Sequence, residues 1–226
     1  MVWQLKSWLG SPGAACQQVM NTAWSGLPGP PGLAGLKTLV VDAEDSFTAM
    51  LGLQLGTLGL QVTIRRFDDA AFDGYDLVVM GPGPGDPRQA DDPKIRSLRA
   101  AVDALLAERR PFVAVCLSHQ VLSMRLGLDL VRRDVPNQGV QRDIELFGDR
   151  ERVGFYNTFA ARSAEDRRHV EGVGLVEVSR DPRTREVHAL RGPHFASVQF
   201  HAESVLTVDG PRIMAGTLGK ALGHAG

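Results

Sequence analysis

The sequence predicts an α/β fold: an open, mostly parallel sheet with helices on both faces, plus a smaller antiparallel extension. From about residue 36, short apolar runs alternate with helical patterns, an order typical of parallel sheets. After about residue 140, strand-like runs follow one another without long helices between them, which indicates antiparallel pairing. The chain has 226 residues, enough for one domain with a substantial hydrophobic core.

The first part of the chain has the order βαββαβα, which is flavodoxin-like. Strand patterns predict strands at 38–41, 61–66, 77–80 and 112–116. Helical spacing predicts helices at 46–58, 93–108 and 117–126. Asp45 and Ser46 stand where the cap of the first helix is expected.

The second part predicts the antiparallel extension and a closing helix. The strand-like runs lie at 140–146, 152–156, 173–178, 186–190 and 195–200. The helix is expected over roughly 210–222.

Residues 1–35 differ from the rest of the chain. Lys6 is their only charged residue, and a stretch rich in Pro and Gly follows at 27–32. Because this composition is typical of a linker, we expect 1–35 to form a partly disordered leader, with a short helix at 2–9. Residues 36–226 are then the folded domain.

Composition excludes several classes of function. The 25 Lys and Arg residues balance 26 Asp and Glu, and no dense basic patch indicates nucleic-acid binding. No apolar run approaches the ~20 residues that span a membrane. The two cysteines, Cys16 and Cys116, are too few for a disulfide framework and fit a reducing cytoplasm.

Cys116 is a candidate nucleophile because it stands between the predicted strand 112–116 and the helix that follows. A residue at such a corner projects from the carboxyl edge of the sheet, beside the positive end of the helix. That end stabilises a thiolate and offers free N–H groups to an oxyanion. The alternative is a structural core residue, the commoner role of a lone cysteine.

The segment Gly81-Pro82-Gly83-Pro84-Gly85-Asp86-Pro87 directly follows the predicted strand at 77–80. Ligands of open α/β sheets bind beyond the carboxyl ends of strands, and this stiff loop has bare backbone that can approach a ligand closely. The alternative is a plain rigid turn. The segment 81–87 is not a phosphate loop, because it lacks a Gly-Lys-Ser/Thr ending and its prolines lack N–H donors.

His201-Ala202-Glu203 follows the run 195–200 and offers a base with an orienting carboxylate. A thiol nucleophile needs a base, and the base needs a group that fixes its ring. An extended backbone at Ala202 would point both side chains to one side. The alternative is a loop histidine beside a surface glutamate. His194 is a rival base, but it stands at the start of its strand, the wrong end for this site.

Together these motifs resemble the class I (triad) glutamine amidotransferases over about residues 36–222. The motifs are the loop 81–87, Val115-Cys116-Leu117-Ser118-His119-Gln120 and Gln199-Phe200-His201-Ala202-Glu203-Ser204. The segments 40–47, 136–141 and 153–161 are similar to the amidotransferase portion of anthranilate-synthase-like enzymes. Within these they most resemble the phenazine-biosynthesis branch, aminodeoxyisochorismate synthase.

One motif departs from the family pattern. The usual elbow is Gly-x-Cys-x-Gly-His-Gln, whereas this chain has Ala114 and Ser118 at the glycine places. Ala and Ser are the next smallest residues, so we expect the sharp turn to survive with a slightly different backbone. The phenazine branch carries the same two residues, which supports the resemblance.

The resemblance implies a role for each of several residues. The catalytic triad would be Cys116, His201 and Glu203, and the oxyanion would meet the backbone N–H groups of Leu117 and Gly83. Residues Gly83, Gly85, Leu117, Gln120, Thr158 and Phe159 would bind the substrate L-glutamine. Gln120 would hold its α-amino or carboxylate end, and His119 would be structural.

The family also implies a partner. Ammonia would pass through protein to a chorismate-using synthase, a separate subunit or a fused domain, which forms aminodeoxyisochorismate or anthranilate. The synthase would need Mg²⁺, whereas this chain would need no cofactor and no metal. Two alternatives remain: a stand-alone cysteine hydrolase of γ-glutamyl compounds, which needs neither a partner nor Gln120, and a non-catalytic partner-binding module. The intact Cys116, His201 and Glu203 argue against the second.

Overall fold

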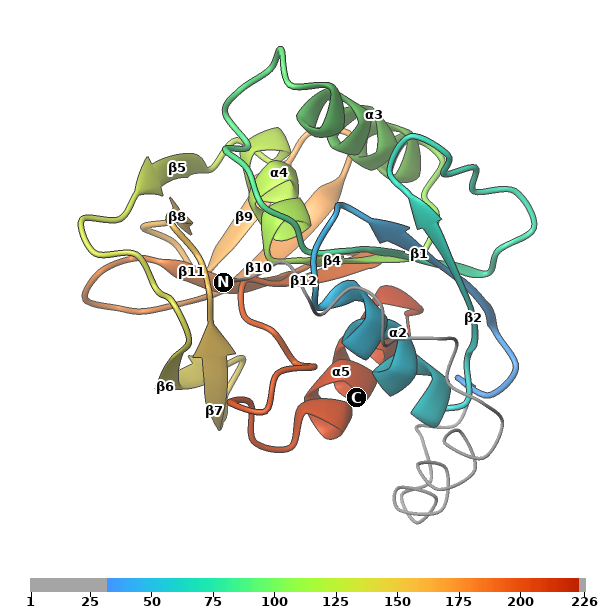
Figure 1. Ribbon diagram of the computed structural model, residues 1–226. Helices are drawn as coiled ribbons and strands as arrows, with labels where there is room; N and C mark the ends of the chain where they lie inside the picture. The colour runs from blue at the N-terminus through green and yellow to red at the C-terminus, as the bar shows by residue number, and fades with distance from the viewer. Residues whose placement is uncertain (1–31, 224–226) are drawn as a thin grey trace, which may run out of the picture.

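A central eight-stranded sheet organises the molecule in the computed structural model, which describes residues 32–223 (Figure 1). The strand order is β2-β1-β3-β4-β12-β11-β10-β9. The strands are β1 (Lys37–Asp42), β2 (Gln61–Arg66), β3 (Leu77–Met80), β4 (Phe112–Val115), β9 (Arg167–Val170), β10 (Gly174–Arg180), β11 (Val187–Arg191) and β12 (Phe195–Val198). The helix expected at 2–9, Cys16 and most of the predicted leader lie outside the described residues.

Four helices and two small sheets complete the described part of the fold. The helices are α2 (Thr48–Thr57), α3 (Pro93–Ala107), α4 (Leu117–Arg125) and α5 (Gly210–Ala221). The small sheets pair β5 (Asp129–Arg132) with β8 (Phe159–Arg162), and β6 (Val140–Leu146) with β7 (Asp149–Phe155). None of these helices is long and apolar enough to cross a membrane.

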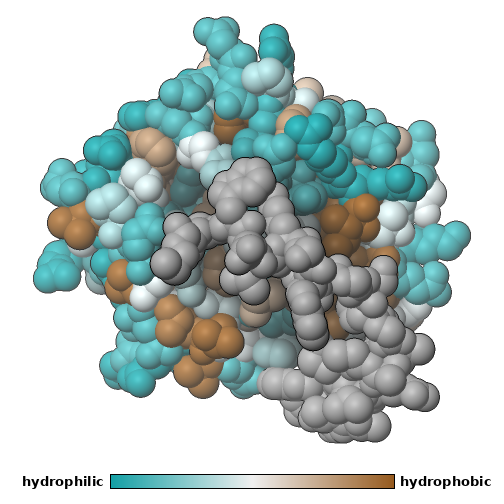
Figure 2. All heavy atoms as spheres, viewed as in Figure 1, coloured by the Kyte–Doolittle hydropathy of each residue, from teal (hydrophilic) through white to brown (hydrophobic). Residues whose placement is uncertain are grey.

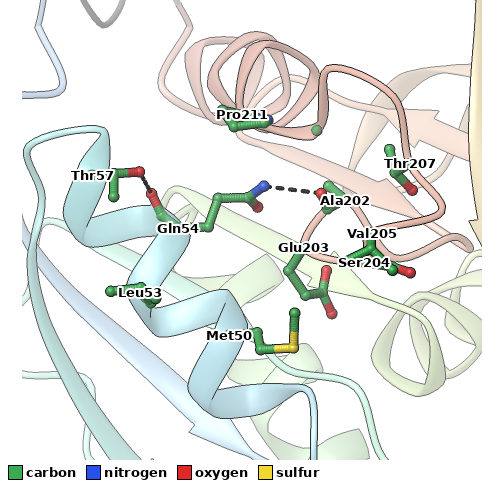
Figure 3. A pocket seen from close by; sticks show the side chains of 11 residues that line it. Met50, Leu53, Gln54, Thr57, Ala202, Glu203, Ser204, Val205, Thr207 and Pro211 are labelled. Carbon is green, nitrogen blue, oxygen red and sulfur yellow. Dashed lines mark hydrogen bonds between the residues drawn. The ribbon is translucent and has the colours of Figure 1, made fainter. Parts of the chain in front are cut away.

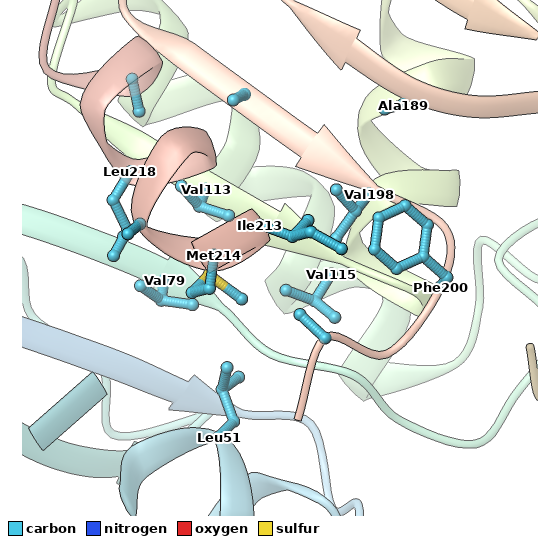
Figure 4. Close-up of a cluster of buried hydrophobic side chains, with 14 of the residues drawn as sticks. Leu51, Val79, Val113, Val115, Ala189, Val198, Phe200, Ile213, Met214 and Leu218 are labelled. Carbon is cyan, nitrogen blue, oxygen red and sulfur yellow. The ribbon is translucent and has the colours of Figure 1, made fainter. Parts of the chain in front are cut away.

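Each face of the sheet carries its own hydrophobic core. Side chains of a strand point alternately to opposite faces, so Val113 and Val115 of β4 pack under α2 and α5. Figure 4 shows this layer, with Met214 of α5 beside Val79. Phe112 and Ala114 point the other way, toward α3 and α4.

On the face in Figure 2, hydrophilic side chains predominate and hydrophobic ones form small separate groups.

The predicted fold class is confirmed, since β2-β1-β3-β4-β12 is the strand order of flavodoxin-like sheets with helices on both faces.

Some details of the prediction are wrong. The run 195–200 is only partly antiparallel: β12 (Phe195–Val198) pairs antiparallel with β11, as expected, but it also pairs parallel with β4, Val198 lying opposite Val115. A buried apolar run looks the same in either pairing direction, so the sequence pattern could not decide this. β5, β8 and β9 were not predicted; they are only four residues long each.

The start of α2 also differs from the expectation. The helix begins at Thr48, and its N-cap residue, Phe47, makes no side-chain cap. Asp42, at the end of β1, organises this turn instead: its Oδ1 accepts from the Thr48 hydroxyl at 2.8 Å and from the Glu44 N–H at 2.8 Å. Asp45 accepts from the Phe47 N–H at 2.8 Å.

Candidate active site

Cys116 occupies a strained corner between β4 and α4. The strand ends at Val115, one residue earlier than expected, and Cys116 has φ 51° and ψ −102° as the N-cap of the helix. A positive φ at a non-glycine residue costs about 1–3 kcal/mol and persists only when the surroundings impose it. Here the Cys116 N–H donates to Val198 O at 2.9 Å, and its carbonyl accepts from the Gln120 N–H at 3.0 Å. The fold therefore fixes the direction of the thiol.

The Gly-Pro loop is pressed against the end of β1. A Cβ on Gly83 would lie 2.3 Å from the carbonyl oxygen of Ala43, so only glycine fits there. Gly85 has φ 138°, a conformation that other residues rarely adopt. Both glycines line the same cavity as Cys116.

Ser118, one of the two departures from the family elbow, connects the elbow to this loop. Its side chain is fully buried, and its hydroxyl donates to Gly81 O at 2.7 Å. A glycine at this position could not make the bond. The serine therefore ties the first turn of α4 to the start of the loop that contains Gly83.

We expect Ser118→Ala to destabilise the fold by about 1–3 kcal/mol, because a buried carbonyl loses its donor. We also expect kcat/KM for glutamine to fall about fivefold, since about 1 kcal/mol of loop positioning is lost. Urea unfolding and steady-state kinetics measure the two effects. Ser123→Ala is the matched control: Ser123 is buried in the same helix and donates to His119 O at 2.8 Å, away from the loop. Equal effects of both substitutions on kcat/KM would contradict the role of Ser118.

His201 and Glu203 form a buried pair. His201 Nδ1 and Glu203 Oε1 are 2.8 Å apart, and both side chains are almost completely buried. The backbone between them is not extended, because residues 202 and 203 form a turn. The His201 N–H donates to Gly154 O at 3.0 Å, which anchors the base to β7.

The electrostatics of the pair favour a charged imidazole. Burial lowers the pKa of His201, but the adjacent Cys116 sulfur and the Glu203 carboxylate outweigh it and hold this pKa well above its usual value. Because Nδ1 faces Glu203, Nε2 is the nitrogen available for exchange with Cys116 Sγ. The arrangement suits a thiolate paired with an imidazolium.

Two aromatic residues hold the His201 ring from the cavity side. The Phe47 ring lies 4.7 Å from the His201 ring and 4.9 Å from the Tyr156 ring, centroid to centroid. The Tyr156 hydroxyl lies 2.9 Å from Ser204 Oγ. Sequence reasoning gave neither residue a role, although both stand in segments that carried the family resemblance.

A cavity of about 310 Å³ collects nearly all the predicted site residues. Its lining includes Gly83, Gly85, Cys116, Leu117, Gln120, Thr158, Phe159 and His201. The volume is at the lower end of the range for small-molecule sites. Leu117 is the first residue of α4, so its N–H has no acceptor within the helix.

Glu203 does not line this cavity. It lines a second one of about 430 Å³ between α2 and the start of α5, with Met50 and Leu53 of α2 (Figure 3). Gln54 of α2 also lines this space and donates to Ala202 O at 2.9 Å. Cys116 does not line this second cavity.

The other histidines near the sheet do not line the active-site cavity. His119 Nδ1 lies 2.8 Å from Ser197 Oγ, and burial, aided by His188, lowers the pKa of His119 to about 3. It is therefore neutral at physiological pH, as a structural residue would be. His194 O accepts from the Phe112 N–H at the start of β4, the end of the strand opposite Cys116.

Within residues 32–223, no group of three or more His, Cys, Asp or Glu side chains could hold a metal ion. Cys116 is a free, buried cysteine.

Comparison with known proteins identifies the family. Residues 39–221 match the model of the class I glutamine amidotransferases. The chain belongs to this family. The resemblance stated from the motifs is thereby confirmed.

Two relatives from Pseudomonas species are especially similar. The chain is 62% identical over 192 residues to "Anthranilate synthase, phenazine specific" of Pseudomonas fluorescens, covering 84% of this chain and 30% of that protein. It is 61% identical, with the same coverage, to the protein of that name from Pseudomonas chlororaphis. The chain thus spans about a third of the length of these relatives.

A shorter relative supports the same assignment, and a solved structure shares the fold. Anthranilate synthase component 2 of Mycobacterium tuberculosis is 30% identical over 198 residues, covering 81% of this chain and 82% of that protein. The fold is similar to that of a glutamine amidotransferase from Thermotoga maritima. That likeness has a TM-score of 0.57 at 16% identity and covers 74% of this chain and 76% of the other.

Proposed function

We propose that this amidotransferase hydrolyses L-glutamine through a cysteine thioester and delivers the ammonia to a chorismate-using synthase. The main support for this proposal is that Cys116 and His201 line the same cavity, while Glu203 is hydrogen-bonded to Nδ1 of the His201 ring. A nucleophile, a base and an orienting carboxylate are the parts that acyl transfer requires.

Acylation begins when Cys116 Sγ attacks the side-chain amide carbon of glutamine. The carbonyl oxygen becomes an oxyanion that accepts hydrogen bonds from the N–H groups of Leu117 and Gly83, each contributing about 3 kcal/mol. The imidazolium of His201 gives its Nε2 proton to the leaving nitrogen, which departs as ammonia. A glutamyl thioester on Cys116 remains.

Deacylation regenerates the enzyme. His201, now neutral, removes a proton from water, whose oxygen attacks the thioester carbon. The C–S bond breaks, glutamate leaves, and the proton on His201 restores the ion pair with the Cys116 thiolate. The sum is glutamine plus water giving glutamate plus ammonia.

The proposed recipient follows from the relatives. Those named as phenazine-specific anthranilate synthases are about three times as long as this chain. We propose that a chorismate-using synthase, fused or separate, accepts the ammonia and holds Mg²⁺. The relatives are named anthranilate synthases and phenazine specific, so the proposed product is either anthranilate or aminodeoxyisochorismate.

We expect glutaminase activity to rise about tenfold or more when a chorismate-using synthase and chorismate are added, which corresponds to about 1.4 kcal/mol of additional transition-state stabilisation. Glutamate release with and without the synthase measures the coupling, and analysis of the aromatic product separates aminodeoxyisochorismate from anthranilate. Unchanged turnover together with cleavage of γ-glutamyl peptides would instead identify a stand-alone cysteine hydrolase.

A further inference from the structure

Gln199 connects the nucleophile to the substrate pocket. It follows β12 directly, and its side chain is buried with 1% exposure. Val198 and Phe200 pack into the core under α5, so Gln199 and His201, on the alternate positions, point toward the site. Sequence reasoning included Gln199 in a motif without giving it a role.

The side chain of Gln199 makes two hydrogen bonds of opposite kind. Its Nε2 donates to Cys116 Sγ at 3.7 Å, within the range for a sulfur acceptor. Its Oε1 accepts from Gln120 Nε2 at 3.0 Å. The second bond fixes the orientation of the amide, because Gln120 supplies a donor and Gln199 must meet it with its oxygen. The nitrogen of Gln199 is thereby directed at the sulfur.

The number of available hydrogens also fixes the orientation of the Gln120 side-chain amide. An amide nitrogen has two hydrogens, and Gln120 uses them on Gln199 Oε1 and on Phe159 O, the latter at 2.9 Å. Within residues 32–223, no group donates to Gln120 Oε1, and Gln120 lines the cavity. Gln120 therefore presents an acceptor to the substrate.

We infer that Gln199 is the positioning residue that directs a neutral donor at the Cys116 thiolate and locks Gln120 so that its oxygen receives the α-ammonium group of glutamine. This inference rests on the proposed function. It gives the Gln199 side chain a role toward both the nucleophile and the substrate. One chain of hydrogen bonds, Phe159–Gln120–Gln199–Cys116, orients the substrate-binding amide and the donor to the sulfur together. Loss of Gln199 should therefore weaken both.

Two substitutions separate these halves. Gln199→Met keeps the volume but removes both bonds, so we expect kcat/KM for glutamine to fall at least about tenfold, with KM raised. Gln199→Glu keeps an acceptor for Gln120 but directs a negative oxygen at the sulfur. We expect it to leave KM closer to wild type and to slow alkylation of Cys116 by iodoacetamide more strongly than Gln199→Met does.

Alkylation of Cys116 is a measurement that would not change if the role of Gln199 were merely structural. Removing a donor from the sulfur, or placing a negative charge beside it, lowers the rate at which iodoacetamide alkylates Cys116 across the pH profile. Mass spectrometry of the Cys116 peptide follows the reaction separately from Cys16. Ser197→Ala is the matched control, because Ser197 is equally buried on β12 and, among the described residues, its hydroxyl bonds only to His119. It should leave KM and the alkylation profile unchanged.

A second measurement does not depend on whether the Gln199 variants fold. The substrate analogue 4-carbamoylbutanoate lacks the α-ammonium group that Gln120 would bind. Replacing glutamine with this analogue should therefore lower kcat/KM more in the wild type than in Gln120→Met. An equal loss in both proteins would overturn the inference. So would folded Gln199 variants whose kinetics and alkylation stay within twofold of wild type. If Cys116→Ala is inactive in the same assays, the proposed function stands in either case.

Discussion

Cys116→Ala is expected to lower glutamine turnover at least about 10³-fold, because the thioester cannot form without the sulfur. The measurement is glutamate release under saturating glutamine, with the synthase present. The residual rate would come from the oxyanion donors and from substrate positioning alone. Cys116→Ser should be nearly as inactive, since a hydroxyl beside His201 is a weaker nucleophile than a thiolate.

Both variants should remain folded, which makes the loss interpretable. Alanine and serine keep the positive φ of the corner, and the backbone bonds to Val198 and from Gln120 do not involve the side chain. Wild-type protein quenched in acid during turnover should carry a glutamyl group on the Cys116 peptide. Turnover that survives Cys116→Ala, or an adduct on another residue, would refute the thioester mechanism.

Much of the fold follows from local pattern in the sequence. The strands at 61–66, 77–80 and 140–146 begin and end where the pattern predicts, because period and length distinguish them from the helices. Pairing direction does not follow, as β12 illustrates: whether Phe195–Val198 lies parallel to β4 depends on how the intervening 79 residues return to the sheet. That information is not local.

The candidate site divides in the same way. Cys116, Gly83 and the His201–Glu203 pair each stand in a short motif whose chemistry can be recognised from neighbouring residues. The bond from Gln199 to Cys116 joins residues 83 apart in sequence, and it exists because β12 and β4 pair in one register. The Phe47 ring on His201 likewise depends on how the β1–α2 turn folds against β7. Such contacts require tertiary structure.

Glu203→Gln is expected to lower kcat about 10²-fold or more while leaving the fold intact. The amide retains an oxygen near His201 Nδ1, so the ring keeps a hydrogen-bond partner, but the negative charge that stabilises the imidazolium is lost. The comparison is kcat at fixed pH, together with urea unfolding. Glu171→Gln, on the exposed loop before β10, is the control for loss of one carboxylate.

The pH profile separates this role from a structural one. In the wild type, Cys116 and Glu203 together raise the pKa of His201 against the opposing effect of burial. Without the carboxylate that pKa falls, so imidazolium is lost at a lower pH and the alkaline limb of the kcat profile moves toward neutrality. A structural Glu203 would instead give a stability loss like that of a core truncation, about 2–5 kcal/mol, with the alkaline limb unmoved. Only the first outcome is consistent with a carboxylate that acts through the charge of His201.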